Sequence, residues 1–477
     1  MEKGISLDPS CVRPELILLR PKHPETKRDI AVQCLCVEAG LHFDFNDRYE
    51  LPDRVPDNLE GAKAVLIDPE SWDAYRSGED GRRLDAFLQR GGLVYATRGP
   101  QQFDALDDQF TRSGLEAIAA SAALTPNHPA VRARLQARTF RQLYGELREP
   151  YFTGQFEGGL TREPWREPYA YNVLQSAELF SETDPGFGWN ERLRQNLDYM
   201  MSNVKMEMDS FDRLIPLESF LRMASLTGDP RYVEFAAQAL DKVVTTFPRL
   251  MGVPLLKPDR DRLLWNECTS HFAVLAAALG ALLRRQDWTE LAVHIVRTVH
   301  DLNCGPQHKL WYHAGRPGWH TPALWARGQA WALTGCVGVL RHLPAEHPGR
   351  TLLLDYLREM LSGIAACQND EGLWHNVLDN AGSRVEARAS GMFCYLFAEV
   401  KRRGWLEGAA LDTLLRRAWR GVRGRVWKDR FCTNCCGTPA CLTYNAYLSR
   451  PHLFTGASTA LRAGAAYVLA YGDDSDL

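Results

Sequence analysis

From about Tyr169 onward, apolar residues recur at the spacing of amphipathic helices, and the connectors carry Gly, Pro, Trp and His. The pattern predicts helices over 171–182, 191–203, 211–226, 230–247, 269–286, 288–303, 331–343, 350–368, 387–403, 409–422 and 461–471. Helical hairpins repeating at roughly 45–60 residues are typical of closed rings and of solenoids. A ring of six hairpins, an (α/α)6 barrel, and an open solenoid both fit this pattern.

The first part of the chain differs, because short apolar runs alternate there with helical segments. Strands are predicted over 15–20, 42–46, 62–68 and 93–97, and helices over 26–41 and 80–90. Such alternation predicts a small parallel sheet. In its pattern this region resembles the flavodoxin-like or the amidotransferase-like fold. We therefore expect a mainly α protein with an α/β flavodoxin-like accessory domain over 1–125, a connector over 126–168, and a helical catalytic domain over 169–477.

Composition narrows the function classes. The 477 residues are 45% apolar and carry a formal net charge of −3. Without an excess of positive charge, we do not expect a nucleic-acid-binding protein. No apolar run is long enough to span a membrane, and the N-terminus lacks a signal-peptide pattern. Several of the 12 cysteines lie in apolar helical runs, which indicates reduced thiols and a cytoplasmic protein. The N-terminal domain is a candidate contact for a homo-oligomer.

The segment Trp325–Trp331 carries two indoles, a guanidinium and an amide beside an apolar helix. Arg327 can bind a carboxylate through two parallel hydrogen bonds. Trp325 and Trp331 offer flat apolar faces for a sugar ring, and Gly328 allows a close approach to the backbone. A helix N-terminus also favours an anion. The segment therefore favours a pocket for an acidic sugar, with core packing of the tryptophans as the alternative.

Two acids, Asp212 and Glu267, lie at predicted helix starts, where first-turn acids are common. Trp265 lies beside Glu267, and an apolar wall raises the pKa of a carboxyl group into the range of a general acid. This neighbour favours a catalytic role for Glu267 over helix capping.

Three further residues are candidates for substrate contact, with core or surface packing as the alternative for each. They are His271, one turn after Glu267, His313 in an aromatic loop, and Trp374 in a second aromatic loop. The dense group Cys432, Cys435, Cys436 and Cys441 resembles a zinc-site spacing, but ligand pairs normally lie further apart. We expect no metal and no cofactor.

The order of these segments resembles glycoside hydrolase families 88 and 105, the unsaturated glucuronyl and rhamnogalacturonyl hydrolases. The resemblance covers roughly residues 205–472. It rests on the family motifs Trp-Ala-Arg-Gly-Asn-Gly-Trp at 325–331, Tyr-Tyr-His-Gly at 311–314, Gln-x-x-x-Gly-Leu-Trp-His at 368–375, and Glu-Thr-Ser-Ala-Ser-Ala-Met-Phe at 386–393, and on a closing segment from Gly437 through Tyr447 to Ala465.

The resemblance implies an (α/α)6 barrel with its site at one mouth of the ring. It places Glu267 at the family's catalytic Asp and Asp212 at the acid that starts the third helix. His313, Arg327 and Trp331 take the places of substrate-binding residues. Arg388 stands where the family has Ser and adds a candidate carboxylate clamp.

These residues fit two reactions that remove a terminal uronic acid from an oligosaccharide or glycoside. Hydrolysis of a saturated β-glucuronide needs two carboxyl groups, and Asp212 with Glu267 supplies such a pair. The alternative is hydration of a 4,5-unsaturated uronic acid. Because Glu267 replaces the family's Asp, the sequence favours the β-glucuronidase. A non-catalytic helical scaffold with a degenerate sugar pocket is the third hypothesis.

Overall fold

The computed structural model describes residues 16–18, 43–44, 54–55, 59, 64–67, 72–96, 135–153, 170–203, 214, 217–256, 262–383, 385–427, 430–436, 443–444, 447, 452–456, 458–475 and 477. The chain divides into two compact units. One unit comprises residues 1–138, 423–439 and 449–457, and the other comprises 139–422, 440–448 and 458–477. The first unit thus also includes two segments from the C-terminal part of the chain. Both lie within residues 169–477, where only the helical domain was expected.

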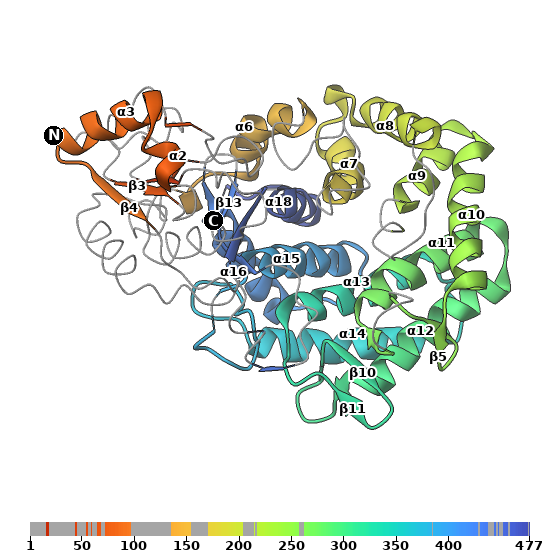
Figure 1. Ribbon diagram of the computed structural model, residues 1–477. Helices are drawn as coiled ribbons and strands as arrows, with labels where there is room; N and C mark the ends of the chain where they lie inside the picture. The colour runs from red at the N-terminus through yellow and green to blue at the C-terminus, as the bar shows by residue number, and fades with distance from the viewer. Residues whose placement is uncertain are drawn as a thin grey trace. The chain divides into compact units, whose positions relative to one another are not determined.

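The larger unit is built around a closed ring of helices (Figure 1). Within the described residues, each inner helix contacts the next, and the last contacts the first. The inner ring consists of α7 (Ala170–Thr183), α9 (Leu217–Thr227), α11 (Val274–Leu283), α13 (Ala326–His342), α15 (Ala387–Arg402) and α18 (Ser458–Tyr471). The closed ring confirms the expected (α/α)6 barrel over the open solenoid.

An outer helix precedes each inner helix along the chain. The outer helices are α6 (Phe140–Thr153), α8 (Trp189–Asn203), α10 (Pro230–Thr246), α12 (Gln286–Asn303), α14 (Gly349–Ala366) and α16 (Ala409–Arg423). They are amphipathic: α10 buries Tyr232, Ala236, Ala239, Leu240 and Val243 on one face. Among the described residues, no helix combines the length and apolar character needed to cross a bilayer.

Small residues let the inner helices approach one another closely. A π-helical turn, η5 (Thr269–Ala273), precedes α11 and packs against α13. A Cβ atom at Gly335 of α13 would lie 2.3 Å from the Thr269 hydroxyl, and one at Gly338 would lie 2.5 Å from Val274. Glycine is therefore required at this contact, because any larger side chain would push the two elements apart.

Helix α13 begins earlier than the pattern predicts. The expected helix starts at residue 331, whereas the observed one starts at Ala326 with Trp325 as its N-cap. The predicted boundary is wrong because Gly328 and two tryptophans read as loop residues. Glycine fits position 328 of the helix because a Cβ atom there would lie only 3.1 Å from the His313 ring.

Short strands join the helices at one end of the ring, where only loops were expected. They include β7 (Leu264–Trp265), β8 (Cys304–Gly305), β9 (Leu310–Trp311), β10 (Ala314–Arg316) and β11 (Trp319–His320). Strand β10 lies between β11 and β7, with Ala314 opposite Trp265. Strands β5 (Arg249–Leu250) and β6 (Val253–Pro254) form a separate two-stranded antiparallel sheet.

The smaller unit contains a four-stranded parallel sheet of order β2-β1-β3-β4. Its strands, β1 (Leu16–Leu18), β2 (Phe43–Asp44), β3 (Ala64–Ile67) and β4 (Leu93–Ala96), fall at the four predicted positions. Helices α2 (Trp72–Tyr75) and α3 (Gly78–Gln89) lie between β3 and β4 in sequence. The helix expected over 26–41 lies outside the described residues.

The C-terminal segments of this unit form a second sheet, of order β12-β13-β14. Its antiparallel strands are β12 (Val426–Trp427), β13 (Arg430–Cys436) and β14 (His452–Gly456). Cys436 of β13 pairs with His452 of β14.

A partly buried ion pair joins α9 to the C-terminal end of α13. Glu218 accepts a hydrogen bond from Arg341, and His342 lies 3.5 Å from the same carboxylate oxygen. Burial by itself would raise the pKa of Glu218, but the charges of Arg341 and His342 outweigh it and lower the pKa from 4.5 to about 2. A carboxyl group whose pKa is lower in the folded than in the unfolded protein stabilises the fold at pH values above its unfolded-state pKa.

We predict that Glu218→Gln lowers the free energy of unfolding at pH 7, because Arg341 loses its counter-charge. The difference from wild type should shrink as the pH falls from 4.5 to about 2, where Glu218 itself becomes protonated. Urea titrations at several pH values measure this. Asp355→Asn, which removes an exposed pair with Arg358, is the control and should change little. A Glu218→Gln defect that persists unchanged at pH 2 would contradict the assignment.

Candidate active site

Three sequence motifs meet where η5, α13 and α15 begin. The side chain of Asn266, at the end of β7, donates a hydrogen bond of 3.1 Å to the carbonyl of Gly328 in the first turn of α13. Arg327 in the same turn lies 3.5 Å from Glu386, the N-cap of α15. Glu267 and Arg327 are therefore held on adjacent elements at the same mouth of the ring.

Glu267 is buried, with 6% of its surface exposed, and its two oxygens have different surroundings. Oε1 lies 3.0 Å from Nε2 of His313. Oε2 is buried without a hydrogen-bond partner among the described residues. A buried carboxyl oxygen without a partner is costly unless it is protonated or meets a ligand. This asymmetry makes Glu267 the clearest candidate for chemistry at this mouth.

His313 is fixed on every side. Its Nδ1 lies 2.9 Å from the hydroxyl of Tyr447, opposite the contact with Glu267. The rings of Trp265 and Trp325 lie 4.6 and 4.4 Å away, and only 1% of the histidine is exposed. The backbone assists, because the carbonyl of His313 accepts a hydrogen bond of 3.0 Å from the Asn266 N–H. The imidazole therefore has one available orientation.

Trp325 is fully buried, and its faces are occupied by protein groups. The His313 ring packs against it, and the guanidinium of Arg327 lies 4.7 Å from its centroid. Its indole N–H donates to the side chain of Asn376 at 3.0 Å. This position suits a wall that supports His313 and Arg327, whereas the sequence predicts a platform for a sugar ring.

Asn376 links three segments of the site. Its side-chain oxygen accepts from Trp325, its amide donates to the carbonyl of Tyr447 at 2.8 Å, and its backbone carbonyl accepts from the N–H of Ala326. Neither Asn376 nor Tyr447 was among the predicted site residues. The matched closing segment includes Tyr447, but no local pattern shows that its side chain reaches His313.

The first turn of α15 brings a second pair of charges to the mouth. Glu386 is fully buried, caps the helix by accepting from the N–H of Ala389, and lies near Arg327. Arg388, two residues later, is also buried. Both predicted clamp residues, Arg327 and Arg388, thus occupy first turns of neighbouring inner helices, where the helix dipole favours an anion.

His271 and Trp331 lie together on η5 and α13. Their rings are 4.9 Å apart in an edge-to-face arrangement, and Nδ1 of His271 lies 2.6 Å from the hydroxyl of Ser270. Trp331 is partly exposed, in contrast to Trp325. Trp331 is thus the tryptophan of the motif that retains an accessible surface.

Trp374 and Gln329 have the surroundings of structural residues. The Trp374 indole N–H donates to the carbonyl of Ile364 at 2.7 Å, and its ring packs against Phe393. The amide of Gln329 pairs with both the N–H and the carbonyl of Trp311. Gln329 therefore joins α13 to β9.

Comparison with known proteins settles the family. The family model of Glycosyl Hydrolase Family 88 matches residues 175–468, which is more than half of the chain. The chain belongs to Glycosyl Hydrolase Family 88. The resemblance inferred from the motifs is thus confirmed at the family level.

Two relatives are similar in sequence to parts of this family 88 chain. The unsaturated rhamnogalacturonyl hydrolase YesR of Bacillus subtilis (strain 168) is 26% identical over 189 residues, which cover 36% of the chain and 53% of YesR. Protein Atu3128 of Agrobacterium fabrum is 40% identical over 91 residues, which cover 18% of the chain and 39% of that protein. The chain spans about half or less of the length of these relatives.

Solved structures support the fold of the helical unit. A possible member of the GH105 family from Salmonella enterica serovar Paratyphi A has a TM-score of 0.59 at 19% identity, over 72% of the chain and 96% of that structure. A glycosyl hydrolase family 88 structure from Bacteroides vulgatus has a TM-score of 0.52 at 14% identity, over 69% and 96%. At these identities the similarity concerns the fold alone.

Two predicted features of this family 88 chain lie outside the described residues. Asp212 is one. The side chains of Cys432, Cys435 and Cys436 and the whole of Cys441 are the other. Among the side chains that are described, no group of three or more His, Cys, Asp or Glu is arranged to hold a metal ion.

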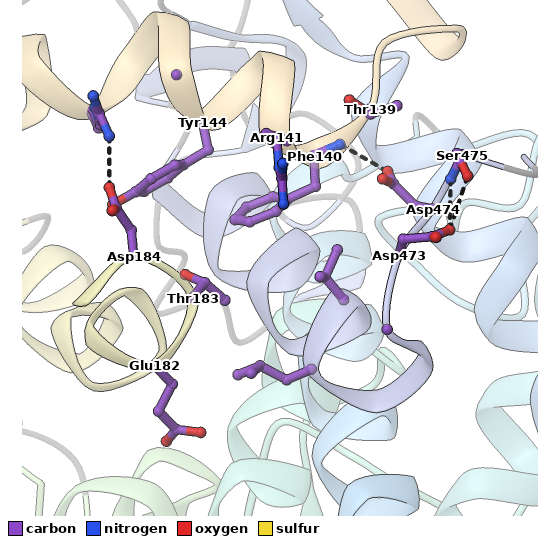
Figure 2. Close-up of a pocket in the computed structure, with 15 residues that line it drawn as sticks. Thr139, Phe140, Arg141, Tyr144, Glu182, Thr183, Asp184, Asp473, Asp474 and Ser475 are labelled. Atoms are coloured by element: carbon purple, nitrogen blue, oxygen red, sulfur yellow. Dashed lines mark hydrogen bonds and ion pairs between the residues drawn. The ribbon is translucent and has the colours of Figure 1, made fainter. Parts of the chain in front are cut away.

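Two cavities lie away from Glu267, at the C-terminal ends of inner helices. One of about 950 Å³ follows the ends of α7 and α18, and one of about 500 Å³ lies by the ends of α11, α13 and α15. In the larger cavity the acids are already engaged: Asp184 pairs with Arg148, and Asp474 accepts from the N–H of Phe140 (Figure 2). These cavities do not belong to the candidate active site.

We predict that Asn376→Ala lowers the free energy of unfolding by about 2–4 kcal/mol, because it leaves a buried indole N–H and a buried carbonyl without partners. Chemical denaturation followed by tryptophan fluorescence measures the change. Asn380→Ala is the matched control. Asn380 is only partly buried. Its side chain donates to Tyr444 and accepts from the N–H of Gly382, and water can replace both bonds, so the loss should stay within ~1 kcal/mol. Equal losses in the two variants would contradict the linking role of Asn376.

Proposed function

We propose that this protein removes a terminal 4,5-unsaturated uronic acid from an oligosaccharide by hydrating the double bond. The observation that carries the proposal is Glu267, a buried carboxyl group with one oxygen held by His313 and the other without a partner among the residues that the structure describes. The name of the relative YesR, an unsaturated rhamnogalacturonyl hydrolase, supports the same substrate class. This reverses the preference drawn from the sequence, which placed the saturated β-glucuronide first.

One carboxyl group is sufficient for the proposed reaction. Protonated Glu267 gives its proton to C4 of the substrate, and positive charge develops at C5 and the ring oxygen. Water adds to C5 and returns a proton to Glu267, so the acid is regenerated. The product is a hemiketal at C5. Its bond between C5 and the ring oxygen breaks to give a ketone at C5 and a hemiacetal at C1. The bond from C1 to the rest of the oligosaccharide then breaks, which leaves an aldehyde at C1 and releases the oligosaccharide as an alcohol.

Arg327 is the proposed site for the substrate carboxylate. A guanidinium has five N–H donors, so the contact of its Nε with Glu386 is compatible with binding a second carboxylate. The buried cation lies at the start of α13, where the helix dipole adds to the attraction. Arg388 and the partly exposed Trp331 are proposed to border the same uronate, and His271 to position Trp331.

The saturated β-glucuronidase remains the second candidate. The specific observation in its favour is that Glu267 replaces the family's Asp, since the added methylene changes the reach of the carboxyl group. That reaction requires a second carboxyl group, for which Asp212 is the candidate. A separation of roughly 5–5.5 Å would predict retention of configuration and roughly 6.5–9.5 Å would predict inversion.

We predict that Glu267→Gln lowers kcat by about 10²–10⁴-fold, the usual contribution of a general acid, with the fold intact. The assay follows the loss of enol-ether absorbance from a lyase-generated unsaturated disaccharide. Glu290→Gln, an exposed acid on α12, is the control and should retain wild-type turnover. A Glu267→Gln variant with wild-type kcat would eliminate Glu267 as the acid.

The same preparation, assayed on p-nitrophenyl β-glucuronide, separates the candidate functions. Turnover of the unsaturated disaccharide alone supports hydration. Turnover of the saturated glycoside alone rejects it in favour of the β-glucuronidase. A folded protein that turns over neither substrate and binds the disaccharide unchanged would support the scaffold hypothesis.

We predict that Arg327→Ala lowers kcat/KM for the uronide by about 10- to 100-fold, mainly through KM, because a charge-assisted hydrogen bond to the carboxylate is lost. Arg285→Ala, which removes an exposed pair with Asp287, should leave both constants unchanged. The decisive comparison uses a substrate whose carboxylate has been converted to the neutral amide. An equal loss on that substrate would show that Arg327 does not bind the carboxylate.

A further inference from the structure

Tyr447, His313 and Glu267 form a continuous buried line. The tyrosine hydroxyl lies 2.9 Å from Nδ1 of His313, and Nε2 of the same ring lies 3.0 Å from Oε1 of Glu267. Tyr447 is fully buried and reaches this position from the segment 440–448, far from Glu267 in sequence. Its hydroxyl is therefore linked to the proposed acid through the imidazole.

A neutral imidazole carries one N–H, so its two contacts are coupled. If the Tyr447 hydroxyl donates to Nδ1, the proton of His313 is on Nε2 and is donated to Oε1 of Glu267. The proton of the carboxylic acid is then carried by Oε2, the oxygen for which the described part of the chain offers no partner. If instead Nδ1 carries the proton, Nε2 accepts from Glu267, and the acidic proton is held on Oε1 against the histidine.

We propose that Tyr447 is a positioning residue that selects the Nε2–H form of His313 and thereby directs the proton of Glu267 onto Oε2. A phenol is a stronger donor than acceptor, and an imidazole nitrogen is a good acceptor, so the O–H···N arrangement is favoured. The inference rests on the proposed function, because it assigns Oε2 as the oxygen that delivers the proton to C4 and later receives one from water.

The packing around His313 makes this selection necessary. Trp265 and Trp325 confine the ring, so it cannot turn away to expose a different nitrogen. Trp325 is in turn fixed by Asn376, which also binds the backbone of Tyr447. With the ring orientation fixed, the remaining variable is which nitrogen carries the proton, and the hydroxyl of Tyr447 controls it.

The test compares Tyr447→Phe with Tyr444→Phe. Both remove one tyrosine hydroxyl from the same segment, but that of Tyr444 binds Asn380 and lies outside the line. In Tyr447→Phe, kcat should fall about 10- to 100-fold, as for other residues that orient a reacting group, with KM within about twofold. In Tyr444→Phe, both constants should remain within about twofold of wild type. Equal kinetic effects in the two variants would overturn the proposal.

A spectroscopic measurement tests the same inference without any substrate. Nitrogen-15 labelling of the histidines, with the His313 signals assigned from a His313→Gln variant, reports which ring nitrogen carries the proton. Wild type should show the Nε2–H form, and Tyr447→Phe should show a shift toward Nδ1–H. A wild-type protein with the proton on Nδ1 would overturn the assignment even if Tyr447→Phe failed to fold.

The two measurements also separate this inference from the proposed function. The protonation of His313 is independent of what the enzyme hydrolyses. If the unsaturated disaccharide is not turned over while His313 carries its proton on Nε2, the substrate assignment fails and the role of Tyr447 stands. If the disaccharide is turned over and Tyr447→Phe keeps wild-type kcat, the function stands and the role of Tyr447 fails.

Discussion

The candidate site depends on how closely η5 approaches α13. Gly335 leaves room for Thr269, with only 2.3 Å between the Thr269 hydroxyl and the place a Cβ atom would occupy. At that separation the side chain of Asn266 reaches the carbonyl of Gly328. The bond places Glu267 beside the first turn of α13 and its arginine. A wider spacing would leave both charged groups buried without their neighbours, which is energetically unfavourable.

The helices of the barrel can be predicted from the local pattern of apolar residues, but the closure of the ring cannot. Each helix buries one face or all of its surface, and that periodicity is visible in the sequence. Whether consecutive hairpins return to their starting point depends on crossing angles set by contacts such as Gly335 with Thr269, which are distant in sequence. The strands β7 to β11 are only two or three residues long, which is too short to show any alternation.

The site was predictable where a residue type is tied to a motif. Glu267, His313 and Arg327 were predicted from such motifs, and the structure places these candidates on adjacent elements. Tyr447 could not be found, because a tyrosine in a closing segment gives no sign of which side chain it meets. The roles of the tryptophans could not be told apart for another reason. Trp325 supports a histidine, and Trp374 packs in the core. In the sequence, both look the same as a tryptophan that stacks on a sugar ring.

The line from Tyr447 through His313 to Glu267 has a consequence for when the site forms during folding. Its neighbouring members are separated by 134 and 46 positions in the sequence. Contacts between distant positions form only after the entropy of closing the intervening chain has been lost. The hydrogen bonds that orient the acid therefore exist only once the larger unit has folded as a whole, so a partly folded chain carries Glu267 without its orienting partners.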